Sequence, residues 1–157
     1  MRPLILLFAL FFAVAAQANV IRSAPDFSWP AAGNKNRTLK SLRGQPVVLV
    51  IADSPRNGDF RKQLKWLKKN YSELAAKGTV FIAAFREGEG PVKSDIPFVV
   101  ANNGSAVASA YDVSGNFGLA IIGKDGNLDY VTSEVRTGER VRDVVINNFA
   151  PQTASRK

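Results

Sequence analysis

The sequence contains neither cysteine nor histidine. Without cysteine the chain can form no disulfide, and it has no thiolate, the group that attacks peroxides and disulfides. The usual protein ligands of zinc, copper and haem are missing as well. A calcium or magnesium site built from carboxylates needs a loop of spaced Asp and Asn residues, and the sequence has no such loop. We therefore expect no catalytic residue, no metal and no cofactor.

Long apolar runs are also scarce, and the longest covers residues 4–16. It is too short for a comfortable membrane span. It follows Arg2 and ends in Ala16-Gln17-Ala18, which is the pattern of a signal peptide with its cleavage site. We predict a signal peptide over 1–18, cleaved after Ala18, and a periplasmic or secreted product; an uncleaved N-terminal anchor is the alternative. The rest is predicted to be one domain, 19–150, with a disordered basic tail, 151–157.

Acidic residues are fewer than basic ones, 13 against 21. Loss of Arg2 with the signal peptide leaves 20 basic residues against 13 acidic ones, a formal net charge of +7. This excess favours an anionic lipid surface, nucleic acid or an acidic partner. Because the basic residues alternate with acidic ones, a role in solubility alone is the simpler interpretation. We expect no nucleic-acid partner for an exported protein.

Two apolar runs predict the centre of the fold. Residues 46–52 form a β-branched run typical of a strand buried on both faces of a parallel or mixed sheet. A polar turn over 53–58 precedes a helix predicted over 59–77, which Gly78 ends in a left-handed cap. Residues 79–85 form the next buried strand. Strand, helix and strand in this order predict a parallel crossover.

Shorter elements follow. We predict a strand over 97–101, a helix over 105–111 and a third core strand over 119–123, which a hairpin turn at 124–127 joins to a strand over 128–134. A last helix begins near Thr137 and places four apolar residues on one face: Val141, Val144, Val145 and Phe149. Residues 19–36 read as an irregular lead-in.

Four motifs occur in a familiar order. Ala24-Pro25-Asp26-Phe27 opens the domain, Leu42-Arg43-Gly44 precedes the first core strand, and Tyr111, Val113 and Gly115 precede the third; residues 122–126 form the last hairpin. Over residues 24–149 the chain resembles the peroxiredoxin and thioredoxin-like reductase branch (redoxin, AhpC/TSA-like) of the thioredoxin fold. The resemblance implies a thioredoxin-like three-layer α/β sandwich, a central mixed sheet flanked by helices. An unrelated α/β sandwich with similar turns is the alternative.

A shorter resemblance is confined to residues 47–71. This segment is similar to an extracellular thioredoxin-like domain found in matrix and sushi-repeat proteins and in short exported bacterial proteins. That domain is likewise not a thiol enzyme.

The resemblance fails at the residues that carry the family's chemistry. The family's reactive cysteine lies after the first core strand, at the start of the long helix, where this chain has a turn that begins at Ser54. Ser54 has no base identified beside it, so we interpret it as a turn residue. The family's cis-proline corresponds to Phe117, for which we expect an ordinary trans peptide. Both halves of the redox site are therefore missing.

Three groups of residues remain as candidate sites. A helix N-terminus attracts anions, so Ser54, Arg56, Asn57 and Gly58 form a candidate anion or ligand site, with a simple capped helix start as the alternative. Residues 116–118, Asn116, Phe117 and Gly118, form a candidate peptide-contact loop; either Phe117 is an exposed anchor or it fills the space of the absent site. The predicted long helix carries a basic face beside Trp66: Arg61, Lys62, Lys65, Lys68 and Lys69.

Together these features predict an exported thioredoxin-fold module without thiol redox chemistry. We expect it to bind an unknown protein or peptide partner, or to act as a scaffold, through the former active-site face. A redoxin-type antioxidant or oxidoreductase, as the resemblance implies, is one alternative. Association of the basic face with anionic membranes is the other, while the oligomeric state stays open.

Overall fold

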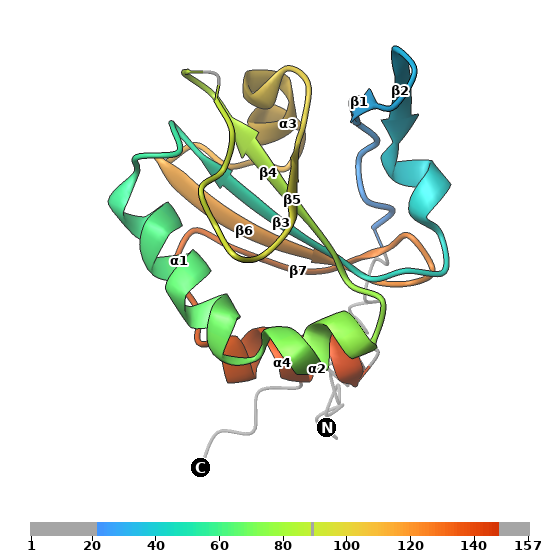
Figure 1. Cartoon of the computed structure of the whole chain (residues 1–157), viewed down its shortest axis with the longest axis vertical. Coiled ribbons are helices and arrows are strands. Elements are labelled where there is room, and N and C mark those ends of the chain that lie inside the picture. The colour runs from blue at the N-terminus through green and yellow to red at the C-terminus, as the bar shows by residue number, and fades with distance from the viewer. Residues whose placement is uncertain (1–21, 89, 148–157) are drawn as a thin grey trace, which may run out of the picture.

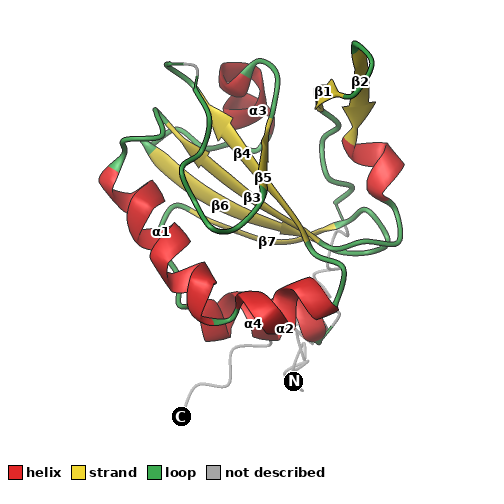
Figure 2. Cartoon of the chain, viewed as in Figure 1, coloured by secondary structure: helices red, strands yellow, loops and turns green. Residues whose placement is uncertain are grey.

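The computed structural model describes residues 22–88 and 90–147, coloured by position in Figure 1. The predicted signal peptide, the basic tail and Phe149 lie outside this part of the chain. The centre is a five-stranded sheet in the order β5-β4-β3-β6-β7. Its strands, yellow in Figure 2, are β3 (Val47–Ala52), β4 (Val80–Phe85), β5 (Phe98–Val100), β6 (Phe117–Ile122) and β7 (Leu128–Thr132).

The middle strand β3 is buried along its whole length. It pairs parallel to β4, with Val47 opposite Val80, and antiparallel to β6, with Val47 opposite Ile122. A strand with neighbours on both edges and cover on both faces has no contact with water, which explains its unbroken apolar sequence. The predicted mixed sheet is thus confirmed.

Helices cover one face of the sheet, as Figure 1 shows for α1 (Gly58–Lys69), α2 (Tyr71–Ala76) and α4 (Gly138–Ile146). Their apolar residues pack with one side of the strands in a single core cluster, which includes Phe60, Leu74 and Val144. The opposite face is covered by α3 (Gly104–Ala110) and by the N-terminal segment around Trp29. These three layers confirm the predicted α/β sandwich.

The helix predicted over 59–77 is two helices, and this prediction was wrong at Asn70. Asn70 leaves helical geometry with φ −113° and ψ 15°, and its N–H bonds the carbonyl of Leu67 instead of that of Trp66. Its side chain is buried against Gly138 at the start of α4. Asparagine forms helices weakly, so the chain bends where α4 meets it. Beyond α2, Gly78 adopts the predicted left-handed cap with φ 73°.

The lead-in is more ordered than predicted. Residues read as irregular include the antiparallel hairpin of β1 (Ser28–Ala31) and β2 (Lys35–Thr38), followed by a short 3₁₀ helix, η1 (Leu39–Leu42). Within it, Trp29 is buried against the sheet. The hydroxyl of Tyr111 donates a 2.8 Å hydrogen bond to the carbonyl of Pro25, which holds the lead-in on α3.

No helix among the described residues is long and apolar enough to cross a membrane.

Candidate functional site

The place of the missing redox site lies at the carboxyl end of β3. There the chain turns through residues 53–57 into α1, and the start of β6 runs alongside. Ala52, the last residue of β3, pairs with Phe117, and the N–H of Asp53 donates a 3.2 Å hydrogen bond to the carbonyl of Asn116. The two segments that carry cysteine and cis-proline in the resemblance are therefore adjacent here.

Asn57 joins these two segments with one side chain. Its Oδ1 accepts a 2.9 Å hydrogen bond from the N–H of Phe60 and so caps α1. Its Nδ2 donates a 3.2 Å hydrogen bond to the carbonyl of Asn116. The carboxamide satisfies one of the amides that a helix start leaves unpaired, and at the same time it fixes the distance between helix and strand.

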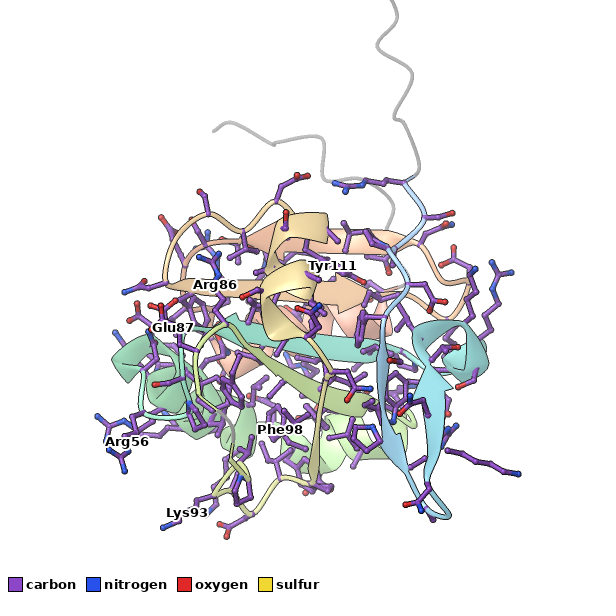
Figure 3. The ribbon with its side chains drawn as sticks, turned by 90° about the horizontal axis from the view of Figure 1, so that it is seen from above. Arg56, Arg86, Glu87, Lys93, Phe98 and Tyr111 are labelled. Atoms are coloured by element: carbon purple, nitrogen blue, oxygen red, sulfur yellow. The ribbon has the colours of Figure 1, made fainter. Side chains whose placement is uncertain are left out.

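The other residues of the candidate anion site lie around this cap. The Oγ of Ser54 accepts a 3.2 Å hydrogen bond from the N–H of Arg56, which is a turn-stabilising contact. Arg56 and Gly58 are exposed. Figure 3 shows Arg56 extending away from the body of the protein rather than over the helix start. The start of α1 is capped, as the alternative to an anion site predicted. Anion binding at this place stays a prediction.

Of the two alternatives for Phe117, the structure excludes the exposed anchor and shows that the ring fills the space of the absent site. It lies in β6, only 1% exposed, and packs in the core cluster beneath α1. Gly118 is buried in the same strand, where a side chain would clash with Val113. The strand starts two residues earlier than predicted because Phe117 fills apolar space next to Ala52. The peptide before Phe117 is trans, as expected. Of the three residues in the predicted peptide-contact loop, only Asn116 is exposed.

Arg86 organises the loop on the far side of the turn. Its guanidinium donates hydrogen bonds to the carbonyls of Val113 and Ser114, just before Asn116. The next residue, Glu87, donates its N–H to the carbonyl of Asp53 at 2.8 Å. Figure 3 shows Arg86 and Glu87 in sequence along this edge, between α3 and the turn that carries Arg56. The end of β4 thus connects both sides of the former redox site.

A groove opens beside this loop, with a volume of about 650 Å³. It is bounded by the end of β4 with the loop that follows it, the end of β5, the start of α3 and the β1–β2 hairpin. Both apolar and polar groups line it, among them Pro30, Phe85, Arg86, Val100, Asn102, Asn103 and Ser105. The sequence reasoning missed this groove, because its walls come from four segments without a shared motif.

The predicted basic face is exposed on α1, as expected. All five cations lie on its solvent side, while Phe60 and Leu67 on the opposite side are buried. Two of the five have partners. Lys68 pairs with Asp95 and lowers the pKa of that carboxyl, and the Lys69 ammonium lies 5.6 Å from the centre of the Trp66 ring. Asp95 therefore offsets one of the five positive charges of the face.

One buried polar residue on α1 escaped the sequence reasoning. Gln63 is fully buried and makes two hydrogen bonds to the backbone of Arg136: its Oε1 accepts from N–H at 2.8 Å, and its Nε2 donates to C=O at 2.9 Å. In the sequence, Gln63 is one polar residue among the cations of the helix. Its role in holding the backbone of Arg136, 73 residues further along the chain, cannot be recognised from the local sequence.

Comparison with known proteins agrees with the fold described above. The model of the AhpC/TSA family matches residues 20–131. No curated protein sequence matches the chain.

Solved structures share the fold at low sequence identity. A thiol:disulfide interchange protein from Bacteroides sp. superposes with a TM-score of 0.65 and 16% identity, covering 86% of this chain and 94% of its own. The thioredoxin peroxidase I of Plasmodium yoelii gives 0.64 and 13%, with 87% and 98% covered. The peroxidoxin BcpB of Mycobacterium tuberculosis gives 0.60 and 14%, with 83% and 97% covered. At these identities the likeness concerns the fold alone.

Proposed function

Because this chain belongs to the AhpC/TSA family but carries no cysteine, we propose that it is an exported binding module which works without thiol redox chemistry. The proposal is supported by the contacts that fill the place of the missing redox site. Asn57 spans the gap between α1 and β6, and Phe117 closes the core beneath it. Without the Asn57 carboxamide, the N–H of Phe60 at the start of α1 would lose its hydrogen-bond partner.

The partner that suits this face is an extended peptide segment. The groove beside Arg86 offers apolar surface from Pro30, Phe85 and Val100 and polar groups from Asn102 and Asn103. Hydrogen-bonding groups suit the main chain of an extended peptide, and apolar surface beside them suits its side chains. The groove adjoins the former active-site turn through Glu87 and Asp53, so it is part of the same face.

Export supports a partner outside the cytoplasm. The proposal includes the signal peptide over 1–18, because the apolar run and the Ala-Gln-Ala pattern occur at the start of the chain. N-terminal sequencing of the purified product from the native cell envelope tests this point. A first residue of Asn19 is the expected result, and an intact N-terminus would contradict cleavage.

The loss of redox chemistry is tested directly. The purified protein is incubated with hydrogen peroxide and, separately, with insulin disulfides and a thiol reductant. We expect no turnover above a heat-treated control, because no residue of the chain supplies a thiolate. Repeated turnover in either assay would overturn the proposal in favour of a redoxin-type antioxidant or oxidoreductase.

Peptide binding is tested with a displayed library of random peptides selected on the wild-type protein. Ser105 and Ser109 are both exposed on α3, but only Ser105 lines the groove. The selected peptides should lose binding to Ser105→Trp, in which the indole fills the groove, and keep it to Ser109→Trp. Equal binding to both variants, or no enrichment on the wild type, would contradict a peptide site at this groove.

A further inference from the structure

A second groove lies away from the former redox site, on the flank of α1 that faces α4. Its volume is about 390 Å³. Lys62 and Trp66 come from α1 and Tyr130 from β7. The connection into α4 and its first turn supply the rest of the wall: Val135, Arg136, Thr137 and Arg140.

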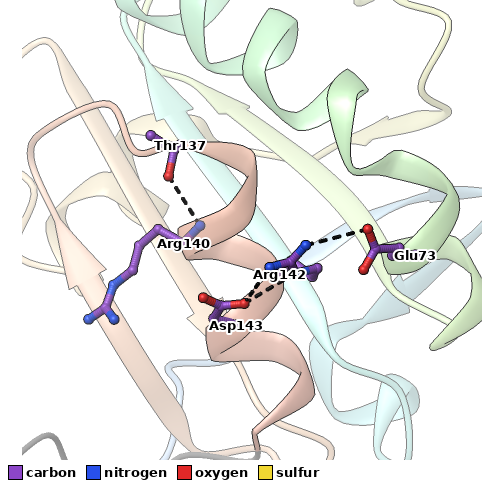
Figure 4. Close-up of polar contacts among 5 residues, drawn as sticks. All are labelled: Glu73, Thr137, Arg140, Arg142 and Asp143. Carbon is purple, nitrogen blue, oxygen red and sulfur yellow. Dashed lines mark hydrogen bonds and ion pairs between the residues drawn. The ribbon is translucent and has the colours of Figure 1, made fainter.

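The close approach of α4 to α1 creates this groove. Gly138, the first residue of α4, lies so near Asn70 and the carbonyl of Trp66 that a Cβ would collide with both. Gln63 holds the preceding segment through its two bonds to the Arg136 backbone. On its other side α4 is fixed to α2, where Arg142 reaches Glu73 at 3.5 Å, as Figure 4 shows. The walls are thus preformed.

The charge on the walls is of one sign. Lys62, Arg136 and Arg140 are cationic, and none of the described lining residues carries a carboxylate. Arg136 has one acidic neighbour, Glu134, whose Oε2 lies 2.8 Å from its Nη2. The Nε of Arg136 is buried and has no hydrogen-bond partner in the described chain. Two arginines and a lysine around one groove favour an anion with several oxygens, because each oxygen can accept a charge-assisted hydrogen bond.

Two aromatic rings line the same groove. Arg140 lies 5.6 Å from the ring centre of Tyr130, and Lys69 lies the same distance from that of Trp66. Both rings are partly exposed. Thr137 caps α4 by accepting a 3.1 Å hydrogen bond from the N–H of Arg140, so the positive end of the helix also faces this region. Figure 4 shows the Arg140 side chain directed away from Arg142 and Glu73.

We propose that this groove binds a phosphate ester, with the phosphate at Lys62 and Arg136 and the attached organic group on the rings of Trp66 and Tyr130. Arginine and lysine together offer donors to several oxygens of one phosphate, and arginine matches its geometry with paired N–H groups. Aromatic rings add contact with the organic part. The ester is either a soluble molecule or the headgroup of a lipid, and the two sources share this chemistry.

The soluble source is tested with phenyl phosphate, and inorganic phosphate serves as the ligand without a ring. Binding is followed through the fluorescence of Trp66, because the only other tryptophan, Trp29, is 3% exposed. A Trp29→Phe variant assigns the signal. We expect saturable binding of phenyl phosphate, tighter than that of inorganic phosphate. Lys62→Ala should weaken it about tenfold, the loss of one charge-assisted hydrogen bond.

Lys65 supplies the matched control, since it is an exposed lysine of the same helix that does not line the groove. Lys65→Ala removes the same charge and should change binding less than about twofold, since an exposed charge at that distance is screened. Arg136→Ala should match Lys62→Ala. No saturable fluorescence change with phenyl phosphate or vesicles, or equal losses in Lys62→Ala and Lys65→Ala, would overturn the proposal.

The lipid source is tested by sedimentation with vesicles that contain phosphatidylglycerol. Weaker binding by Lys62→Ala but not by Lys65→Ala places a lipid headgroup in the groove. Equal weakening by both variants overturns a headgroup in the groove and indicates a diffuse attraction of the basic face. The peptide groove is unaffected by these variants, so either result is independent of the proposed function.

Discussion

Asn57 and Asn116 are 59 positions apart in the sequence, and the side chain of the first donates a 3.2 Å hydrogen bond to the carbonyl of the second. The same carboxamide caps α1 through the N–H of Phe60. In the thiol enzymes that the chain resembles, the turn that contains Asn57 holds a reactive cysteine, and the residue after Asn116, here Phe117, is a cis-proline. Here the space between them is occupied by an internal hydrogen bond, so a polar structural contact has taken the position of the chemistry.

Asn57→Ala should destabilise the protein by about 1–2 kcal/mol, because it removes both the cap and the bond to Asn116. Asn57→Asp keeps the acceptor and loses the donor, so its free energy of unfolding should lie between those of the wild type and Asn57→Ala. Urea unfolding measures the difference. Arg56→Ala, an exposed neighbour, should stay within about 0.5 kcal/mol of the wild type. An Asn57→Ala variant as stable as Arg56→Ala would contradict the role of the carboxamide.

Gln63→Leu should lower the free energy of unfolding by about 2–3 kcal/mol, since it leaves the N–H and C=O of Arg136 without partners in a buried place. Denaturant titration of this variant beside Lys65→Ala is the measurement. Because leucine has a similar size, the loss would come from hydrogen bonding rather than from a cavity. A stability equal to that of Lys65→Ala would show that water satisfies the Arg136 backbone.

The stability of the protein should rise as the pH falls from 7 towards 5. Partial burial, with Asp125 nearby, raises the pKa of Asp129 from 3.8 to about 6. The folded state therefore takes up this proton before the unfolded state does. The contribution is fully present below the unfolded pKa and is lost as the pH rises through 6. Asp129→Asn should thus stabilise the protein at pH 7 by about 1 kcal/mol after allowance for solvent screening.

This effect has an internal control in its pH dependence. Well below pH 3.8 the wild type and Asp129→Asn should be equally stable, because the carboxyl is then neutral in both the folded and the unfolded state. Thermal unfolding from well below pH 3.8 up to pH 7 follows the difference. A difference that does not change with pH would indicate that the substitution acts through packing.

Anion binding at the start of α1 is tested with sulfate on a Lys62→Ala background, which removes the groove between α1 and α4 from the measurement. Arg56→Ala should weaken sulfate binding about threefold, the effect of one exposed charge near a helix start. Identical weak binding with and without Arg56 would leave Asn57 as a simple helix cap. Chemical shifts of the Gly58 and Asp59 amides report the binding.

Local patterns in the sequence predict the sheet well. The composition of residues 46–52 is enough to predict a buried strand. The turns predicted at Gly78 and at 124–127 are present in the structure. The break at Asn70 in the helix predicted over 59–77 could not be predicted from the local sequence. It depends on the packing of Gly138, at the start of α4, against Asn70. The β1–β2 hairpin is too short and polar for its pattern to stand out from a loop.

The site was harder to predict than the fold. Missing cysteine and proline could be read directly, and a capped helix start was the alternative for this segment, although Asn57 was not singled out as the cap. The burial of Phe117 was one of two alternatives, since an aromatic residue at the start of a strand fits an exposed loop equally well. Both grooves depend on segments that meet only in space. Lys62 and Arg136 carry no sequence signal that connects them.

Gly138 can be used to compare this protein with related sequences, because its lack of a side chain allows α4 to lie close to α1. Any residue larger than glycine there would push the start of α4 off α1 and change the shape of the cleft below Trp66. A relative with glycine at this position and cations at the equivalents of Lys62 and Arg136 would keep the groove in which we propose that a phosphate ester binds. With alanine or a bulkier residue there, the groove would have a different shape, so this position is the first to compare among relatives.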